Sequence, residues 1–175
     1  EFALTGGQIA DITNLNDGPI TVTASVSDAH GNAATPAERT ITLDNLAPQV
    51  SIDATLEIDN IVNNAEEGSV VVTGTSAGAV GRTVTVTADD SNGGTTAVSA
   101  TGTIQTDGTY SVTLGTLNGL DDGSITITAD VSDLAGNAAT QATKTLTLDD
   151  TAPSITIATT LEGDNKVNAA EDGHV

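Results

Sequence analysis

Along most of the chain, apolar residues alternate with threonine, serine or charged residues. Within residues 49–153 this alternation forms seven runs, at 50–54, 69–75, 82–88, 96–104, 108–115, 124–132 and 142–149. A period of two places successive side chains on opposite faces of a β-strand. The segments between the runs are rich in Gly, Asn and Asp, which favour tight turns. Seven short antiparallel strands in about 105 residues predict an all-β, immunoglobulin-like sandwich.

Long stretches of the sequence repeat at an offset of 105 positions. TLDNLAPQVSIDATLEIDNIVNNAEEG, from Thr42, is matched by TLDDTAPSITIATTLEGDNKVNAAEDG, from Thr147, and VSDAHGNAAT, from Val26, by VSDLAGNAAT, from Val131. This self-similarity predicts tandem repeats. Residues 1–48 are expected to be the C-terminal part of one repeat, 49–153 a complete repeat and 154–175 the N-terminal part of the next. Pro48 and Pro153 are each expected to precede the first strand of a repeat.

Composition narrows the possible partners. The chain has 24 acidic and 4 basic residues, a net charge of −20, and no cysteine or tryptophan. Nucleic acid is excluded as a partner, because binding to phosphates requires lysine and arginine. A strongly acidic chain relieves its self-repulsion by binding cations. No run approaches the roughly 18 apolar residues of a membrane-spanning helix, so the chain is not expected to cross a membrane.

The acidic residues fall mainly in loops that share one end of the predicted sandwich, the end at which the last strand leaves it. Oxygen ligands that converge from several loops suit Ca²⁺, which takes six to eight of them. The candidate calcium ligands are Asp17, Asp28, Asn32, Asp44, Glu57, Asp59, Asn60, Glu66, Glu67, Asp107, Asp121, Asp122, Asp133, Asn137 and Asp149. Asp89, Asp90 and Asp150 lie at the same end. The spacing of these residues is not that of an EF-hand.

Two kinds of site are expected. At the joint between repeats, Asp17 and Asp44 of the preceding repeat would face Asp107, Asp133 and Asn137 of the complete one and share an ion. The acids of loop 55–68 would instead serve a site within their own repeat. The alternative is that Asp and Asn in these turns only cap backbone groups, and that Asp28/Asn32 and Asp133/Asn137 form plain turns.

No enzymatic motif is present. The sequence lacks a nucleophile elbow, a catalytic cysteine and a phosphate-binding loop. Paired carboxylates such as Asp121 and Asp122 lack the aromatic sugar platforms that glycoside hydrolysis usually needs. Tyr110 is expected to pack in the core. We therefore expect neither enzymatic activity nor a small-molecule substrate.

The combination of LDDTAPS, DNIVNNAEE, DGSITITA and VSDLAGNAAT resembles the extender repeats of giant RTX adhesins, the biofilm and ice-adhesion proteins that Gram-negative bacteria export by type I secretion. The resemblance implies a stalk of Ca²⁺-stiffened domains, located outside the cell at its surface, that projects a distal ligand-binding domain. Its partners would be neighbouring repeats of the same chain, joined through calcium. The alternative is an adhesive module that itself binds glycan or a partner cell surface.

Overall fold

The computed structural model describes residues 15–159 and residue 166, and its ten strands form three sheets. The strands are β1 (Gly18–Ala24), β2 (Ala37–Leu43), β3 (Gln49–Ile52), β4 (Ile61–Asn63), β5 (Val71–Ala77), β6 (Thr83–Asp89), β7 (Val98–Thr103), β8 (Thr109–Thr113), β9 (Gly123–Val131) and β10 (Ala142–Asp149). A five-stranded sheet, β4-β10-β9-β6-β7, packs on a three-stranded sheet, β3-β5-β8. The predicted all-β, immunoglobulin-like fold is confirmed.

The core lies between these two sheets. On β6 the side chains of Val84, Val86 and Ala88 are fully buried, whereas the threonines between them face outward. The same alternation runs along β9 and β10, so the period of two read from the sequence corresponds to the two faces of the sheet. Because most core residues are Val, Ile, Leu and Ala, the sandwich buries many small groups rather than a few aromatic ones.

Tyr110 is the aromatic residue of this core, as predicted, and it is 2% exposed. It pairs across the strands with Gly74, and its hydroxyl donates a 2.8 Å hydrogen bond to the backbone carbonyl of Ser51. A Cβ at Gly74 would come within 2.0 Å of that carbonyl oxygen. The absent side chain at Gly74 therefore makes room for the phenol ring.

Strand β4 differs from the sequence prediction, which placed residues 61–63 in a loop. It pairs in parallel with β10, with Ile61 opposite Thr147 and Asn63 opposite Asp149. Val62, which pairs with Leu148, is fully buried in the core. Three residues are too few for an alternating pattern to be recognised, and β4 is held by a partner more than eighty positions away in the sequence.

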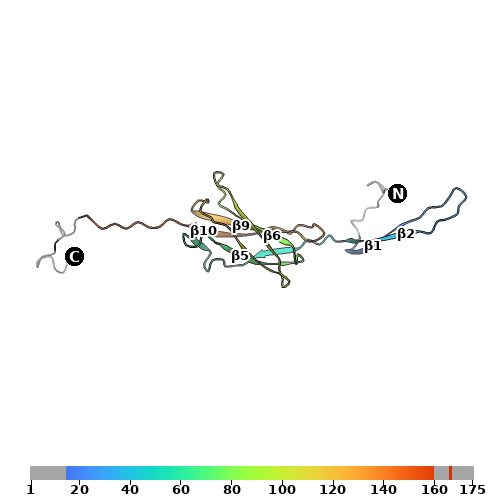
Figure 1. The fold of residues 1–175 in the computed structure, drawn as a ribbon, viewed down its shortest axis with the longest axis horizontal. Helices are drawn as coiled ribbons and strands as arrows, with labels where there is room; N and C mark the ends of the chain where they lie inside the picture. The colour runs from blue at the N-terminus through green and yellow to red at the C-terminus, as the bar shows by residue number, and fades with distance from the viewer. Residues whose placement is uncertain (1–14, 160–165, 167–175) are drawn as a thin grey trace.

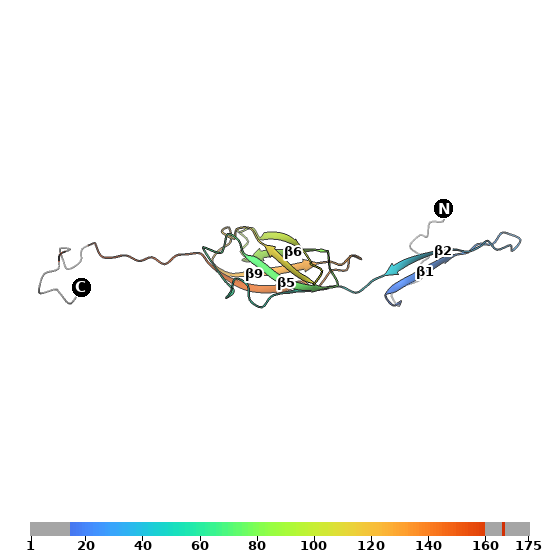
Figure 2. The ribbon, with the colours of Figure 1, turned by 60° about the horizontal axis from the view of Figure 1, so that its bottom comes forward.

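Strands β1 and β2 form a hairpin whose register repeats that of β9 and β10. Val22 and Ile41 are 38% and 45% exposed on it, whereas the residues 105 positions later, Ile127 and Leu146, are buried in the sandwich. The hairpin and the sandwich lie end to end along the long axis (Figure 1; Figure 2 gives a second view). The boundaries proposed for the repeats, 1–48, 49–153 and 154–175, remain predictions.

Pro48 immediately precedes β3, as expected. Residues 154–158, which follow Pro153, form no strand. The difference has a physical reason, because β3 is held by pairing with β5 of its own repeat. The part of the chain that the structure describes holds no such partner for the segment after Pro153. Most of the second copy of the acidic loop, at 160–165 and 167–175, lies outside the described residues.

Candidate calcium-binding loops and the joint between hairpin and sandwich

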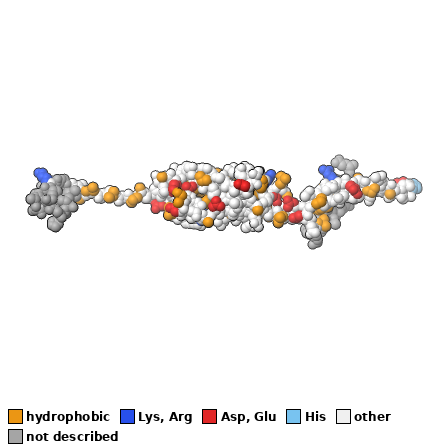
Figure 3. Space-filling view, turned by 90° about the horizontal axis from the view of Figure 1, so that it is seen from below, with side chains coloured by type: hydrophobic (Ala, Val, Ile, Leu, Met, Phe, Trp, Pro, Cys, Tyr) orange, Lys and Arg blue, Asp and Glu red, His pale blue; other side chains and the backbone are white. Residues whose placement is uncertain are grey.

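Three acidic loops meet at the C-proximal end of the sandwich, where β10 ends. The backbone N–H of Leu117 in the β8–β9 loop donates to the carbonyl of Glu67 in the segment between β4 and β5. The β6–β7 loop joins them, because the backbone N–H of Asp121 donates to the Asp90 carboxylate at 2.7 Å. The acidic residues of these loops therefore share one end, as the strand order predicts. Figure 3 shows acidic side chains at both ends of the sandwich on the face in view.

Asp90 organises the contact between two of these loops, although it was not among the predicted ligands. Its carboxylate also accepts from the backbone N–H of Asn92 at 2.9 Å and from the Thr95 hydroxyl at 2.5 Å. The Asn92 side-chain amide in turn donates to the Asp121 carboxylate. These donors hold the pKa of Asp90 below its ordinary value, chiefly through the Asp121 backbone N–H. The DDSNGG sequence indicates the turn but not its partner on the β8–β9 loop.

The segment between β3 and β4 has strained backbone. Glu57, Ile58 and Asn60 have positive φ angles of 45°, 70° and 66°. Such a conformation is unfavourable for a β-branched residue such as Ile58. Strain of this kind persists where the surroundings impose it and often accompanies a functional loop.

The predicted ligands of this segment already accept hydrogen bonds from the backbone. Glu57 Oε1 accepts from the Val71 N–H at 2.6 Å, and Asp59 Oδ1 accepts from the Ile61 N–H at 2.9 Å. Asn60 Oδ1 accepts from the Leu56 N–H at 3.0 Å. These contacts fix the path of the loop, so the capping alternative describes part of what these side chains do.

Glu66 and Glu67 differ in their partners although they are adjacent. Glu66 Oε2 accepts from the backbone and side-chain amides of Asn63, at 3.2 and 2.7 Å. Glu67 Oε2 is buried and has no hydrogen-bond partner among the described residues. A buried carboxylate oxygen without a partner is costly, and a bound cation is one way to satisfy it.

The two DxxGN loops share the hydrogen bonds between their aspartate and their asparagine. Asp133 Oδ1 accepts from the backbone N–H groups of Gly136 and Asn137, and Oδ2 accepts from the Asn137 side-chain amide, all at 2.8 Å. Asp28 and Asn32 on the hairpin form the equivalent bonds at 2.8–2.9 Å. In both loops the asparagine side-chain amide is the main cause that lowers the aspartate pKa. Each pair therefore stabilises its own turn.

A second hydrogen bond is repeated at the offset of 105 positions, just after the last strand of the hairpin and of the sandwich. Asp17 Oδ1 accepts from the Asn45 backbone N–H at 3.0 Å, and Asp122 Oδ1 accepts from the Asp150 N–H, 105 positions later, at 2.9 Å. The Thr151 hydroxyl also donates to Asp122 at 2.5 Å and is the main cause that lowers the Asp122 pKa. Asp149 is exposed at the end of β10. These aspartates fix the path of the chain as it leaves each last strand.

A side-chain hydrogen bond crosses the joint between hairpin and sandwich. The Asn137 side-chain amide donates a 3.0 Å hydrogen bond to the backbone carbonyl of Asp44. The Asp44 carboxylate accepts instead from the Leu46 N–H at 3.2 Å, and Asp107 caps its own turn through Thr109. The structure thus brings Asp44 and Asn137 together, whereas Asp17 contacts Asn45 at the end of its own hairpin and Asp107 contacts its own turn.

The fit to calcium is partial. Carboxylate and carbonyl oxygens at the joint and at the C-proximal end have the chemistry that calcium requires, and Glu67 Oε2 has no hydrogen-bond partner among the described residues. Over residues 15–159, however, no three acidic or histidine side chains lie close enough together to hold a metal ion.

In the same residues, no helix has the length and hydropathy needed to span a bilayer.

No protein-family profile and no curated protein matches the chain. Among solved structures, the tetra-tandem repeat in the extending region of a large adhesion protein is similar, with 33% identity over 79% of this chain and 34% of that one, and a TM-score of 0.52. A Ca²⁺-stabilized adhesin that helps an Antarctic bacterium reach out and bind ice is 27% identical over 78% of this chain and 33% of that one, with a TM-score of 0.45. A bacterial immunoglobulin-like domain from the M. primoryensis ice-binding adhesin is 25% identical over 58% and 96% of the two chains, with a TM-score of 0.37.

The chain spans about a third of the length of the first two of these proteins. The match to the extending region combines sequence identity with a shared fold, and the fold matched is that of tandem repeats in an adhesion protein. An extracellular location is consistent with this likeness. In sequence and in fold the chain resembles the extender repeats of a large adhesion protein, and the predicted resemblance is confirmed.

Proposed function

We propose that this chain is a non-enzymatic extender segment of a bacterial surface adhesin, stiffened by Ca²⁺, that projects a distal ligand-binding domain away from the cell. Its partners are neighbouring repeats of the same chain, and its export follows the type I route expected of RTX adhesins. The observation that carries the proposal is the joint itself. Asp44 and Asn137, from two consecutive units, are hydrogen-bonded there, and the sequence that forms this joint occurs twice in the chain.

The acidic loops support a role for calcium. Residues 49–153 hold 14 acidic and 2 basic residues, so repulsion opposes folding when no cation is bound. Two of the proposed ligands, Glu57 and Asn60, have positive φ angles, and the buried Glu67 oxygen lacks a partner among the described residues. An ion that binds only the folded state stabilises it by about 2.7 kcal/mol at a hundredfold excess over Kd.

The experiment is a thermal melt of the 175-residue chain in a chelator and in millimolar Ca²⁺, with Mg²⁺ as the control cation. We expect the chelator to lower the Tm and Ca²⁺ to restore it, with Mg²⁺ far less effective because it tolerates irregular oxygen sites poorly. A Tm that is the same in chelator and in Ca²⁺, with the metal content of the sample measured, contradicts the calcium part of the proposal.

A further inference from the structure

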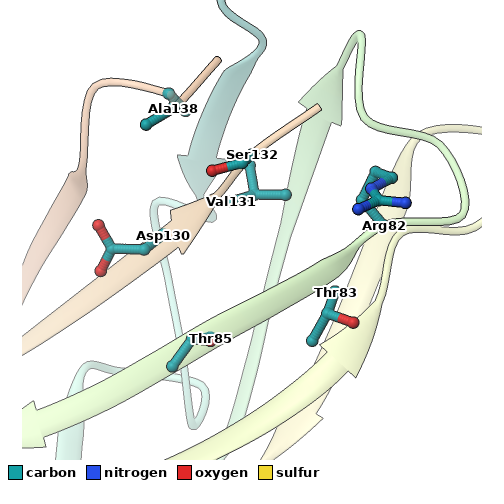
Figure 4. A pocket seen from close by; sticks show the side chains of 8 residues that line it. Arg82, Thr83, Thr85, Asp130, Val131, Ser132 and Ala138 are labelled. Atoms are coloured by element: carbon teal, nitrogen blue, oxygen red, sulfur yellow. The ribbon is translucent and has the colours of Figure 1, made fainter. Parts of the chain in front are cut away.

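A shallow pocket of about 290 Å³ lies on the five-stranded sheet, apart from the acidic loops of the C-proximal end. Its lining comes from the start of β6, the end of β9 and the β9–β10 loop: Arg82, Thr83, Thr85, Asp130, Val131, Ser132, Ala138 and Ala139. Figure 4 shows Arg82 and Asp130 on opposite sides of the pocket, with Ser132 between them. The pocket therefore combines one cation, one carboxylate, three hydroxyl groups and a small apolar patch.

One donor of the Arg82 side chain lacks a partner among the described residues. Its Nε is buried and has no hydrogen-bond partner among the described residues. The carboxylate across the pocket is engaged elsewhere, because Asp130 Oδ2 accepts from the Gln141 side-chain amide at 2.8 Å. Lys144, the other cation of residues 49–153, donates to the Ala54 carbonyl. A buried donor without a partner is rare in proteins, and a bound water or ion is one of its ordinary explanations.

The chemistry of the pocket selects a ligand class. A guanidinium group is a planar fork that binds a carboxylate through two parallel hydrogen bonds. The hydroxyls of Thr83 and Ser132 can donate to or accept from ligand hydroxyl groups. Asp130 retains acceptor capacity for a ligand hydroxyl, since an ionised carboxylate has about four acceptor positions.

We propose that this pocket binds a small hydroxylated carboxylate of the uronic-acid class, with its carboxylate on the Arg82 guanidinium and its hydroxyl groups on Thr83, Ser132 and Asp130. The pocket is small and open, and the chain carries a charge of −20 that repels anions. Binding is therefore weak, with a Kd on the order of millimolar. The proposal does not require an ion at the C-proximal loops, since none of them lines the pocket, and the side chains of Asp133 and Asn137 in the β9–β10 loop are not part of the pocket.

The test is a titration of the ¹⁵N-labelled 175-residue chain, followed by backbone amide chemical shifts at constant ionic strength. The probes are sodium glucuronate, sodium acetate and glucose. We expect glucuronate to shift the amides around Arg82, Thr83 and Ser132 with the highest affinity, acetate to shift those near Arg82 more weakly, and glucose to bind at least tenfold more weakly than glucuronate. Equal affinity for glucose and glucuronate overturns the role of the carboxylate, and equal affinity for acetate and glucuronate overturns the role of the hydroxyls.

Two variants and one control assign the effect to Arg82. Arg82→Gln should abolish the glucuronate shifts, and Arg82→Lys, which keeps the charge but loses the fork, should weaken them severalfold. Arg39→Gln removes the same charge from the exposed hairpin and should bind glucuronate as the parent chain does. Amide shifts of the β3-β5-β8 sheet report whether each variant is folded. A folded Arg82→Gln or Arg82→Lys chain that binds glucuronate with unchanged affinity contradicts the proposal.

Discussion

The side-chain amide of Asn137 donates to the backbone carbonyl of Asp44 across the joint between hairpin and sandwich, at 3.0 Å. The same amide nitrogen donates to Asp133 within its own loop. Asn137 thus couples the conformation of the β9–β10 loop to the end of the preceding unit. A rigid stalk requires contacts of this kind, because a short linker alone leaves the angle between neighbouring units free.

Replacing Asn137 with Ala should loosen this joint. The variant loses the bond to Asp44, worth about 1 kcal/mol, along with its local bond to Asp133. Asn32→Ala is the matched control, because Asn32 makes the same local bond to Asp28 on the hairpin, where the joint is not involved. Residual dipolar couplings should show that the hairpin and the sandwich align independently in Asn137→Ala but together in the parent chain and in Asn32→Ala. Equal alignment in all three chains would mean that the bond does not hold the joint.

Glu67→Gln should separate a calcium ligand from a structural carboxylate. Without calcium, the variant removes the charge of a half-buried carboxylate whose Oε2 has no partner among the described residues, and it should be as stable as the parent chain or more stable, by up to about 1–3 kcal/mol. With calcium, it should gain less stability than the parent chain, because it loses a charged ligand. Both effects are measured as unfolding free energies in denaturant, with and without Ca²⁺.

Glu38→Gln is the control, since Glu38 is exposed on the hairpin, is not a candidate ligand, and its substitution should change stability similarly under both conditions. If Glu67→Gln keeps the full calcium-dependent gain in stability, Glu67 is not a ligand.

Tyr110 should titrate at unusually high pH. Burial, with a smaller contribution from the negative charge of Asp53, raises its pKa from 10.0 to about 12. Because the folded-state pKa lies above the unfolded one, the folded chain gains stability below pH 10 that is lost as the pH rises toward 12. The sequence contains a single tyrosine, so ultraviolet absorbance reports this group alone.

Tyr110→Phe provides the control for this titration. It should remove the loss of stability between pH 10 and 12 that ionisation causes. At neutral pH it should cost about 1–3 kcal/mol, because the Ser51 carbonyl loses its phenol donor. A tyrosine that titrates in the folded chain at its ordinary pKa would contradict the buried position.

The sequence predicts much of the fold because each strand carries its own alternating pattern. The seven runs correspond to β3 and β5–β10, with ends displaced by a few residues. The short β4 is not predicted, because its strand conformation depends on parallel pairing with β10 and not on an alternating pattern of its own. The sharing of one end by the acidic loops also follows from strand order alone.

The internal arrangement of the acidic loops is less predictable. Side chains such as Asp133 and Glu66 accept hydrogen bonds from their own turns, and a sequence pattern does not reveal which carboxylates are satisfied in this way. The contact of Asp90 with the Asp121 backbone depends on the relative positions of two loops 31 residues apart. The unpartnered Nε of Arg82 likewise depends on burial and on the competing bond between Asp130 and Gln141.

The length of tandem arrays tests the stalk most directly. Strands of about eight residues at roughly 3.3 Å each, with loops and a short linker, give on the order of 40 Å per repeat. Small-angle X-ray scattering on chains that carry one, two and four copies of residues 49–153 should show, in millimolar Ca²⁺, a maximum dimension that grows by the same increment with each copy, and a shorter, broader distribution of distances in chelator. A four-copy chain that is compact in millimolar Ca²⁺, with a maximum dimension close to that of two copies, would contradict the extender function.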